Sequence, residues 1–197
     1  MKKSFNYLSK ISVVISATML TAGALKAAPL HPLSEAGKLA GTERKALVTR
    51  EVIEWISMEK ALELCKTNPR KIYIDFYTDW CGWCKKMDRD SFTDQKVVRE
   101  MNAHFYAVKF NAEGREKLTV NGQVYSYSPD QHINSFTLAM LDGQIGYPTS
   151  VIMGEKGEKI TSVPGYQEAP MLVEILSYFG NNKHLTESFE TFQKSGK

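Results

Sequence analysis

Two cysteines three residues apart, Cys81 and Cys84, are the residues in this sequence best suited to chemistry. On the first turn of a helix, this spacing holds the two Cα atoms roughly 5–6 Å apart, which a disulfide tolerates. The pair can therefore alternate between a disulfide and a dithiol with little backbone movement. In such motifs the cysteine pKa can fall from about 8.5 to about 3.5–7.5. Cys81 would then attack a substrate disulfide, and Cys84 would resolve the mixed disulfide.

A strand and a helix must position this pair. Residues 71–77 (KIYIDFY) alternate in a run rich in β-branched and aromatic residues, which predicts a strand, and helix formers follow from Cys84. Asp79 either caps that helix or ends the strand. Cys81 is thus expected at or just before the first helical turn. Unpaired N–H groups and the positive end of the helix dipole favour a thiolate there.

An earlier strand and helix are predicted before this unit. Residues 52–56 are typical of a strand, and Ser57 is a plausible N-cap for the next helix. Cys65 ends an apolar helical stripe that also contains Met58, Ala61 and Leu62. Two interpretations of Cys65 stay open. It is either a buried thiol that behaves as a small hydrophobic side chain, or a third redox cysteine.

A long connection separates the next strand, residues 104–110, from Pro148. Asn121-Gly122 joins residues 118–120 to 123–125 as a two-residue hairpin. A short helix should follow, with Phe136, Ala139 and Met140 on one face and Gly143 as its stop. We hypothesise that the hairpin borders a substrate groove; the alternative is a surface element without function.

The segment after Pro148 completes the predicted domain. Residues 154–157 are typical of the turn of a second hairpin, and Pro170 is expected in the first turn of a helix that Gly180 ends. The apolar face of that helix comprises Leu172, Ile175, Leu176 and Phe179. The tail, residues 181–197, is polar with a short helix expected around Phe189, and it is assigned no function.

The N-terminal residues 1–27 predict a secretory signal peptide, because lysines precede an apolar run that is short for a membrane span. The alternative is an uncleaved anchor. Removing the four lysines of this segment takes the formal net charge from +3 to about −1. The remaining chain has no basic cluster interleaved with exposed aromatics, so nucleic-acid binding is not expected. Residues 28–50 are interpreted as a lead-in.

Four ordered segments resemble the thioredoxin superfamily. They are Asp75-Phe76 with residues 80–85 (WCGWCK), residues 108–111 (VKFN), residues 146–149 (GYPT) and residues 164–166 (PGY). Within the superfamily, the sequence is most similar to thioredoxin-like proteins of bacterial envelopes. The resemblance implies an α/β thioredoxin fold over residues 51–180, with a central mixed β-sheet flanked by helices. A hairpin and helix insertion, about residues 114–141, would precede the cis-proline loop.

The resemblance also implies roles for individual residues. Asp75 would be a buried carboxylate that accepts a proton from Cys84, and Lys109 would neighbour it. From pattern alone, each is equally read as a solvated side chain. A cis bond before Pro148 would let the backbone of Tyr147 pair with a substrate peptide. Trp80, Gly82 and Trp83 would contact substrate beside the cysteines, although Trp80 could be a packing residue and residues 146–149 a simple turn.

The expected function is that of an exported, periplasmic thiol–disulfide oxidoreductase that reduces or isomerises protein disulfides. Because Trp83 replaces the proline of reducing thioredoxins, a disulfide-donating oxidase stays open. So does a non-catalytic peptide-binding module. Expected partners are disulfide-containing proteins and a membrane electron-transfer partner, with the chain itself a monomer. No cofactor is expected, and no metal, because one C-x-x-C supplies only two ligands.

Overall fold

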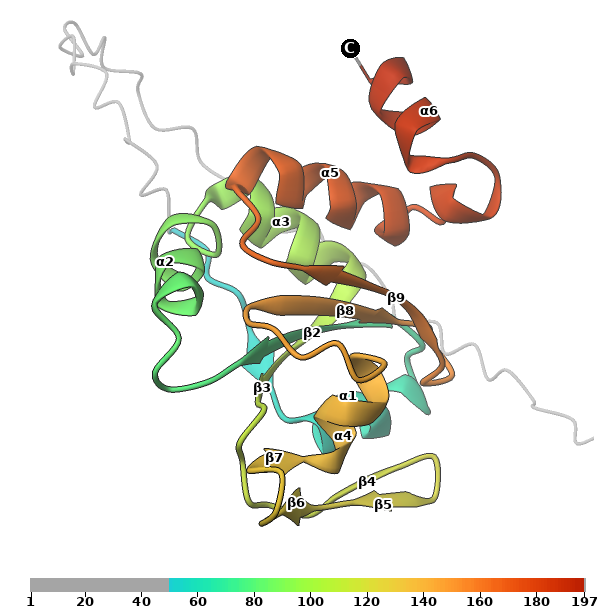
Figure 1. The fold of residues 1–197 in the computed structure, drawn as a ribbon. Helices are drawn as coiled ribbons and strands as arrows, with labels where there is room; N and C mark the ends of the chain where they lie inside the picture. The colour runs from blue at the N-terminus through green and yellow to red at the C-terminus, as the bar shows by residue number, and fades with distance from the viewer. Residues whose placement is uncertain (1–49, 197) are drawn as a thin grey trace, which may run out of the picture. The chain divides into compact units, whose positions relative to one another are not determined.

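The structure is a computed structural model that describes residues 50–196. A five-stranded mixed sheet forms the centre of its fold (Figure 1). The predicted signal peptide and nearly all of the lead-in lie outside the described residues. Strands β1, β3 and β2 are parallel, and β8 runs antiparallel to both β2 and β9. The strands, in spatial order, are β1 (Trp55–Ile56), β3 (Phe105–Asn111), β2 (Lys71–Tyr77), β8 (Thr149–Met153) and β9 (Lys159–Pro164).

Helices cover both faces of the sheet and create two apolar cores. α3 (Gln95–His104) and α5 (Ala169–Gly180) pack on the face that receives Tyr73, whereas α1 (Met58–Cys65) packs on the face that receives Ile72 and Ile74. Alternate side chains of β2 point to opposite faces, so the strand is buried on both sides. β2 therefore fixes the position of the segment that follows its carboxyl end at Tyr77. The described residues contain no helix long and apolar enough to cross a membrane.

Local signals place most element boundaries close to their predicted positions. Ser57 caps α1, accepting a hydrogen bond from the backbone N–H of Lys60 at 3.1 Å. Pro170 stands in the first turn of α5. β1 is shorter than predicted and contains only Trp55 and Ile56. Ile53, which lies before this strand, is nevertheless buried in the core. At this position the apolar residue indicated burial of the side chain and not hydrogen bonding to a neighbouring strand.

The predicted insertion contains two short hairpins and a helix. Asn121 and Gly122 have positive φ angles of 50° and 81°, as the predicted two-residue turn requires. One part of the helix prediction is wrong: α4 buries Phe136 and Thr137, while Ala139 is exposed. The elements are β4 (Leu118–Val120), β5 (Gln123–Tyr125), β6 (Tyr127–Ser128), β7 (Ile133–Asn134) and α4 (Ser135–Met140).

The tip of the β4–β5 hairpin lies at the end of the sheet away from Pro148. The side-chain amide of Asn121 donates a hydrogen bond of 3.3 Å to the carbonyl of Gly157, in the turn between β8 and β9. β8 begins beside Pro148 and runs toward that turn. The hypothesis that the hairpin borders a substrate groove is therefore wrong. Leu118 and Val120, buried in the same core as α1, hold the hairpin there.

The C-terminal tail packs on α5 through aromatic side chains. A 3₁₀ helix (Lys183–Leu185) and α6 (Phe189–Ser195) follow α5, so the predicted short helix around Phe189 is present. The ring of Tyr178 lies 5.1 Å from Phe189 and 5.3 Å from Phe192 between centroids. The hydroxyl of Tyr178 also donates to the carbonyl of Glu187 at 2.6 Å. The tail is thus amphipathic rather than uniformly polar.

Candidate active site

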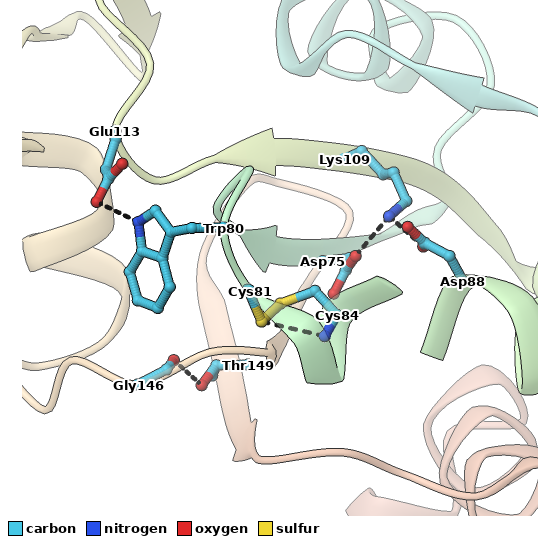
Figure 2. Close-up of a disulfide and its surroundings, with 9 residues drawn as sticks. All are labelled: Asp75, Trp80, Cys81, Cys84, Asp88, Lys109, Glu113, Gly146 and Thr149. Carbon is cyan, nitrogen blue, oxygen red and sulfur yellow. Dashed lines mark hydrogen bonds and ion pairs between the residues drawn. A yellow bond between two sulfur atoms is a disulfide. The ribbon is translucent and has the colours of Figure 1, made fainter. Parts of the chain in front are cut away.

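A disulfide joins Cys81 and Cys84 at the start of α2 (Gly82–Asp90), the helix that follows β2 in the chain (Figure 2). Their Cα atoms are 5.3 Å apart, within the predicted range. Cys81 itself is the N-cap: its Sγ accepts a hydrogen bond from the backbone N–H of Cys84 at 3.0 Å. Asp79 therefore does not cap the helix. Its carboxylate instead accepts a 3.3 Å hydrogen bond from the side-chain amide of Asn111.

Both cysteines are more buried than their helix-start position suggested. Cys81 is 4% exposed and Cys84 is 2% exposed. The capping hydrogen bond explains this, because it turns the Cys81 side chain back over the first helical turn rather than out to solvent. A partner must therefore reach the Cys81 sulfur along a narrow exposed edge, which makes the surrounding surface important.

Asp75 lies on β2 next to the disulfide, only 1% exposed. Its Oδ2 accepts a hydrogen bond from Lys109 at 3.0 Å, while its Oδ1 is buried and has no hydrogen-bond partner among residues 50–196. Figure 2 places this carboxylate between Cys84 and Lys109. Burial raises the pKa of Asp75 to about 6, although Lys109 acts in the opposite direction. The alternative of a solvated Asp75 is therefore wrong. The site therefore has a buried carboxylate with a raised pKa beside the disulfide.

Lys109 bridges two carboxylates from different elements. It pairs with Asp75 across the β2–β3 register and with Asp88 on α2. Burial alone would lower the pKa of Lys109, but the two carboxylates together raise it above its ordinary value. The ammonium also lies over the rings of Trp55 and Tyr77, at 5.3 and 4.9 Å. Lys109 is therefore held in place and charged, rather than freely solvated.

Asp88 was missed by the sequence reasoning. The available signal was its spacing, four residues after Cys84, which places both side chains on one face of α2. Asp88 acts to raise the pKa of Asp75, after the larger effects of burial and Lys109. A cavity of about 500 Å³ lies beside Lys109 and Asp88, lined also by Trp55 and Phe92. The cavity gives water access to the ion pair between Lys109 and Asp88.

Two aromatic pairs stand near the disulfide. Trp80 is 66% exposed and lies 6.1 Å from the ring of Tyr147 in a T-shaped contact. Trp83 is 59% exposed and lies 5.5 Å from the ring of Tyr166. Neither tryptophan is a buried packing residue. Tyr166 belongs to the segment 164–166 that resembles the thioredoxin superfamily, but it was not predicted to lie in the site. Lys86 donates a 3.2 Å hydrogen bond to its hydroxyl.

The loop before β8 carries the predicted cis bond, between Tyr147 and Pro148. The Pro148 carbonyl accepts a hydrogen bond from Gly165 at 2.8 Å, and Thr149 Oγ1 donates to the carbonyl of Gly146 at 2.8 Å. Figure 2 shows Gly146 and Thr149 next to Cys81. Burial raises the pKa of Tyr147 to about 12, so its hydroxyl stays protonated. The loop is thus a fixed, uncharged neighbour of the disulfide.

Gly82, between the cysteines in the motif, is not required sterically. A Cβ atom at this position would meet nothing within 4 Å. The residue therefore leaves open space at the start of α2 rather than avoiding a clash. This open space is available to a partner that approaches Cys81.

Cys65 lies far from this site. It is half-buried at the end of α1, its Sγ donates to the carbonyl of Arg70 at 3.2 Å, and it lines a cavity together with Gly122 and Glu155. Gly122 and Glu155 mark the end of the sheet opposite the disulfide. The structure therefore does not bring Cys65 together with Cys81. Among residues 50–196 there is no group of three or more His, Cys, Asp or Glu side chains that could hold a metal ion.

Comparison with known proteins places this arrangement in context. Residues 58–180 match the sequence model of a family described as a thioredoxin-like domain. The thiol:disulfide interchange protein DsbD of Ralstonia nicotianae is 29% identical over 101 residues, which cover 46% of this chain and 17% of that protein. Its counterpart from Yersinia enterocolitica is 29% identical over 83 residues, covering 42% of this chain and 14% of that protein. The similarity thus spans less than a fifth of the length of these curated relatives.

A solved structure supports the fold assignment. The structure described as DsbH Oxidoreductase superimposes with a TM-score of 0.51 at 17% sequence identity, covering 72% of this chain and 94% of that one. At this identity the likeness concerns the fold alone. The predicted fold class, a mixed sheet flanked by helices, is confirmed.

Proposed function

Because the chain belongs to the thioredoxin-like family, we propose that it is a thiol–disulfide oxidoreductase that reduces or isomerises disulfides in protein substrates. One observation carries the proposal: the Cys81–Cys84 pair lies at the start of α2, beside a buried carboxylate oxygen of Asp75 that has no hydrogen-bond partner in the part of the chain that the structure describes. A disulfide with only a structural role has no need of such an acceptor. The name of the DsbD relatives, thiol:disulfide interchange protein, supports the same chemistry.

The first step is attack by the Cys81 thiolate on one sulfur of a substrate disulfide. The substrate S–S bond breaks, a Cys81–substrate bond forms, and the departing substrate thiolate takes a proton from water. The free N–H groups and dipole at the start of α2 stabilise the attacking thiolate. The capping hydrogen bond from the Cys84 N–H to Cys81 Sγ shows one such donor already aimed at this sulfur.

In the second step Cys84 resolves the mixed disulfide. Its thiol passes a proton to Oδ1 of Asp75, and the resulting thiolate attacks Cys81 Sγ. The Cys81–Cys84 bond forms and the second substrate thiolate leaves, so that two electrons pass from the dithiol to the substrate. With a pKa of about 6, Asp75 is mostly ionised at neutral pH and can accept this proton. Lys109, which pairs with Asp75, lines the cavity together with Asp88, and the proton exchanges with water by this route.

The site residues divide into two proposed groups. Cys81, Cys84, Asp75 and Lys109 carry out or support the thiol chemistry. The proposed substrate-binding group comprises Trp80, Gly82, Trp83, Tyr147 and Pro148. The two tryptophans and Gly82 are exposed, Tyr147 is half-buried and Pro148 is buried. The exposure of both tryptophans would equally suit a peptide-binding module without turnover, which is the second candidate function.

We further propose that the protein is exported to the periplasm and receives electrons from a membrane partner. Support for export comes from residues 1–27, with lysines before an apolar run. A reductase in an oxidising compartment needs a continuous supply of electrons, because its dithiol would otherwise remain oxidised. No cofactor is required for the two steps described above.

The proposal is tested by insulin reduction with dithiothreitol as electron source. The wild-type protein should accelerate precipitation of the insulin chains, and C81S should not. A peptide-binding module would bind peptide but give no thiol-dependent turnover in either form. The equilibrium of the cysteine pair with glutathione then decides the direction: a potential near about −270 mV would support a reductase, and one near about −120 mV would support an oxidase.

A further inference from the structure

A pair of buried hydroxyl groups lies beside Asp75, on the side away from Lys109. In the register of the central sheet, Asp75 stands between Lys109 on β3 and Ser150 on β8. The hydroxyl of Ser150 lies 2.5 Å from the hydroxyl of Tyr73, and either oxygen can be the donor. Ser150 is 1% exposed and Tyr73 is fully buried. The proposed proton acceptor therefore has a polar neighbour that is shielded from water.

The side chains of Tyr73, Asp75 and Ser150 share one face of the sheet. Tyr73 and Asp75 are two residues apart on β2, so their side chains point the same way. Asp75 and Ser150 are direct partners in the antiparallel register, which holds their Cβ atoms about 4.5–5.5 Å apart on the same face. At that separation, rotation about χ1 of Ser150 can bring its hydroxyl to the carboxylate. In this structure the hydroxyl bonds to Tyr73 instead.

The hydroxyl pair has one hydrogen to spare. Two hydroxyl groups carry two hydrogens, and the bond between them uses only one. Oδ1 of Asp75 is buried and has no hydrogen-bond partner among residues 50–196, and it is the only such side-chain atom on β2. A buried donor and a buried acceptor that stay apart each cost free energy. The spare hydrogen and Oδ1 are therefore complementary.

Tyr73 competes with Asp75 for the Ser150 hydroxyl but does not act as a base. Burial raises the pKa of Tyr73 and the charge of Asp75 raises it further, although the bond to Ser150 acts in the opposite direction. The phenol therefore keeps its proton and offers Ser150 a neutral acceptor. An ionised Asp75 is the better acceptor, because a hydrogen bond to a charged group is about twice as strong as a neutral one. A protonated Asp75 loses that advantage.

We propose that Ser150 is a positioning residue for Asp75 and that its hydroxyl alternates between two acceptors. It donates to Oδ1 of Asp75 while the carboxylate is ionised, and it turns to Tyr73 once the carboxyl group holds the proton of Cys84. Only hydrogen bonds change at Ser150; the one proton transferred passes from Cys84 to Asp75. The assignment of that proton to Cys84 rests on the proposed function, whereas the hydrogen bond does not.

A ¹³C NMR titration of the Asp75 carboxyl group in the oxidised protein tests the hydrogen bond. S150A removes the donor to the ionised form, so it should raise the pKa of Asp75 from about 6 to about 7. Y73F removes the competing acceptor and should lower that pKa. S150T, which keeps the hydroxyl, should titrate like wild type. S162A is the matched control and should do the same, because Ser162 pairs with Val151, on the opposite face of the sheet.

The opposite signs expected for S150A and Y73F separate the hydrogen bond from a change in polarity. Removing either hydroxyl makes the surroundings of Asp75 less polar, which alone would raise its pKa in both variants. In Y73F/S150A the tyrosine change should have no effect beyond that of S150A. The other titratable or charged groups that face Asp75 are the same in every variant, namely Lys109, Asp88, Cys84 and Tyr77. Shifts of the same sign in S150A and Y73F, or no shift in S150A, overturn the proposal.

Insulin reduction gives a second readout, which depends on the proposed function. Because the proton acceptor must be ionised, the acid limb of the pH–rate profile should move to higher pH in S150A. Relative to wild type, the rate should fall about fivefold at pH 6 but only about twofold at pH 7. An equal loss at every pH would overturn a role through Asp75. A wild-type protein that reduces no insulin would instead overturn the proposed function, while the titration would still test the hydrogen bond.

Discussion

The Nζ atom of Lys109 lies 3.0 Å from Oδ2 of Asp75, while the other carboxylate oxygen of Asp75 is buried beside the disulfide and accepts no hydrogen bond from the described residues. The ion pair satisfies one side of the carboxylate and leaves the other side free for a proton. Adjacent positions on β2 and β3 create this geometry, because Asp75 and Lys109 are direct neighbours in the parallel register. The same arrangement governs three of the predictions that follow.

Replacing Asp75 should slow resolution of the mixed disulfide. D75N keeps the shape of the side chain but cannot accept the proton of Cys84. We expect the rate of insulin reduction at pH 7 to fall on the order of 100-fold, a typical contribution of a positioned proton acceptor. D79N is the matched control, because Asp79 is exposed, lies two residues before Cys81 and is paired with the side-chain amide of Asn111. Equal rates for D75N and wild type would remove Asp75 from the mechanism.

The raised pKa of Asp75 should also make the stability of the oxidised protein depend on pH. The folded protein holds this proton up to a pH of about 6, whereas the unfolded chain loses it near 3.8. Between these values the folded state binds more protons, so its contribution is fully present below pH 3.8 and is lost as pH rises through about 6. Two pKa units correspond to about 3 kcal/mol.

Urea unfolding of wild type and D75N from pH 4 to 7.5 measures that contribution. The difference in unfolding free energy between the two proteins should shift by about 2–3 kcal/mol in favour of D75N as pH increases across the window. Taking the difference cancels titrating groups common to both proteins. A difference that stays constant with pH would contradict a buried Asp75 with a raised pKa.

Lys109 and Asp88 should move the Asp75 pKa in opposite directions. Lys109 lowers this pKa and Asp88 raises it. K109M is therefore expected to shift the pKa of Asp75 above about 6, and D88N to shift it below. A ¹³C NMR titration of the Asp75 carboxyl group would measure both shifts directly. Shifts of the same sign would show that the two side chains act on Asp75 through a change in structure instead of through their charges.

Cys65 should not take part in the reaction. Its thiol donates a hydrogen bond to Arg70 and lies at the opposite end of the sheet from Cys81. We expect C65A to reduce insulin within about twofold of wild type. In the reduced wild-type protein, N-ethylmaleimide should modify Cys81 first, as followed by peptide mass spectrometry. A large loss of turnover in a C65A protein that still unfolds cooperatively would support the alternative interpretation, in which Cys65 is a third redox cysteine.

Local sequence signals predicted those parts of the fold and site that depend on near neighbours. Alternation in residues 71–77 and the helix formers after Cys84 were enough to place the disulfide at a strand-to-helix junction. The positive φ angles that Asn121 and Gly122 adopt were readable from their residue types. The cis bond before Pro148 and the buried position of Asp75 came from the family resemblance, since pattern alone left both open.

The features that were missed depend on contacts between distant segments. Tyr166 meets Lys86 across 80 residues, and Glu113 meets Trp80 across 33. No periodicity encodes such pairs, because they follow from how β9 and the insertion pack beside α2. The hypothesis that the hairpin borders a substrate groove was wrong for the same reason. The insertion point lies near Pro148 in sequence, but burial of Leu118 beside α1 carries the tip to the other end of the sheet.

Trapping of a mixed disulfide tests the central claim most directly. C84S lacks the resolving thiol, so after incubation with a disulfide-bonded protein its intact mass should increase by the mass of one substrate molecule. Dithiothreitol should reverse the increase. C81S, which retains only Cys84 of the pair, should form no such adduct. Adducts on C81S but not on C84S, or on neither variant, would contradict Cys81 as the nucleophile of a thiol–disulfide oxidoreductase.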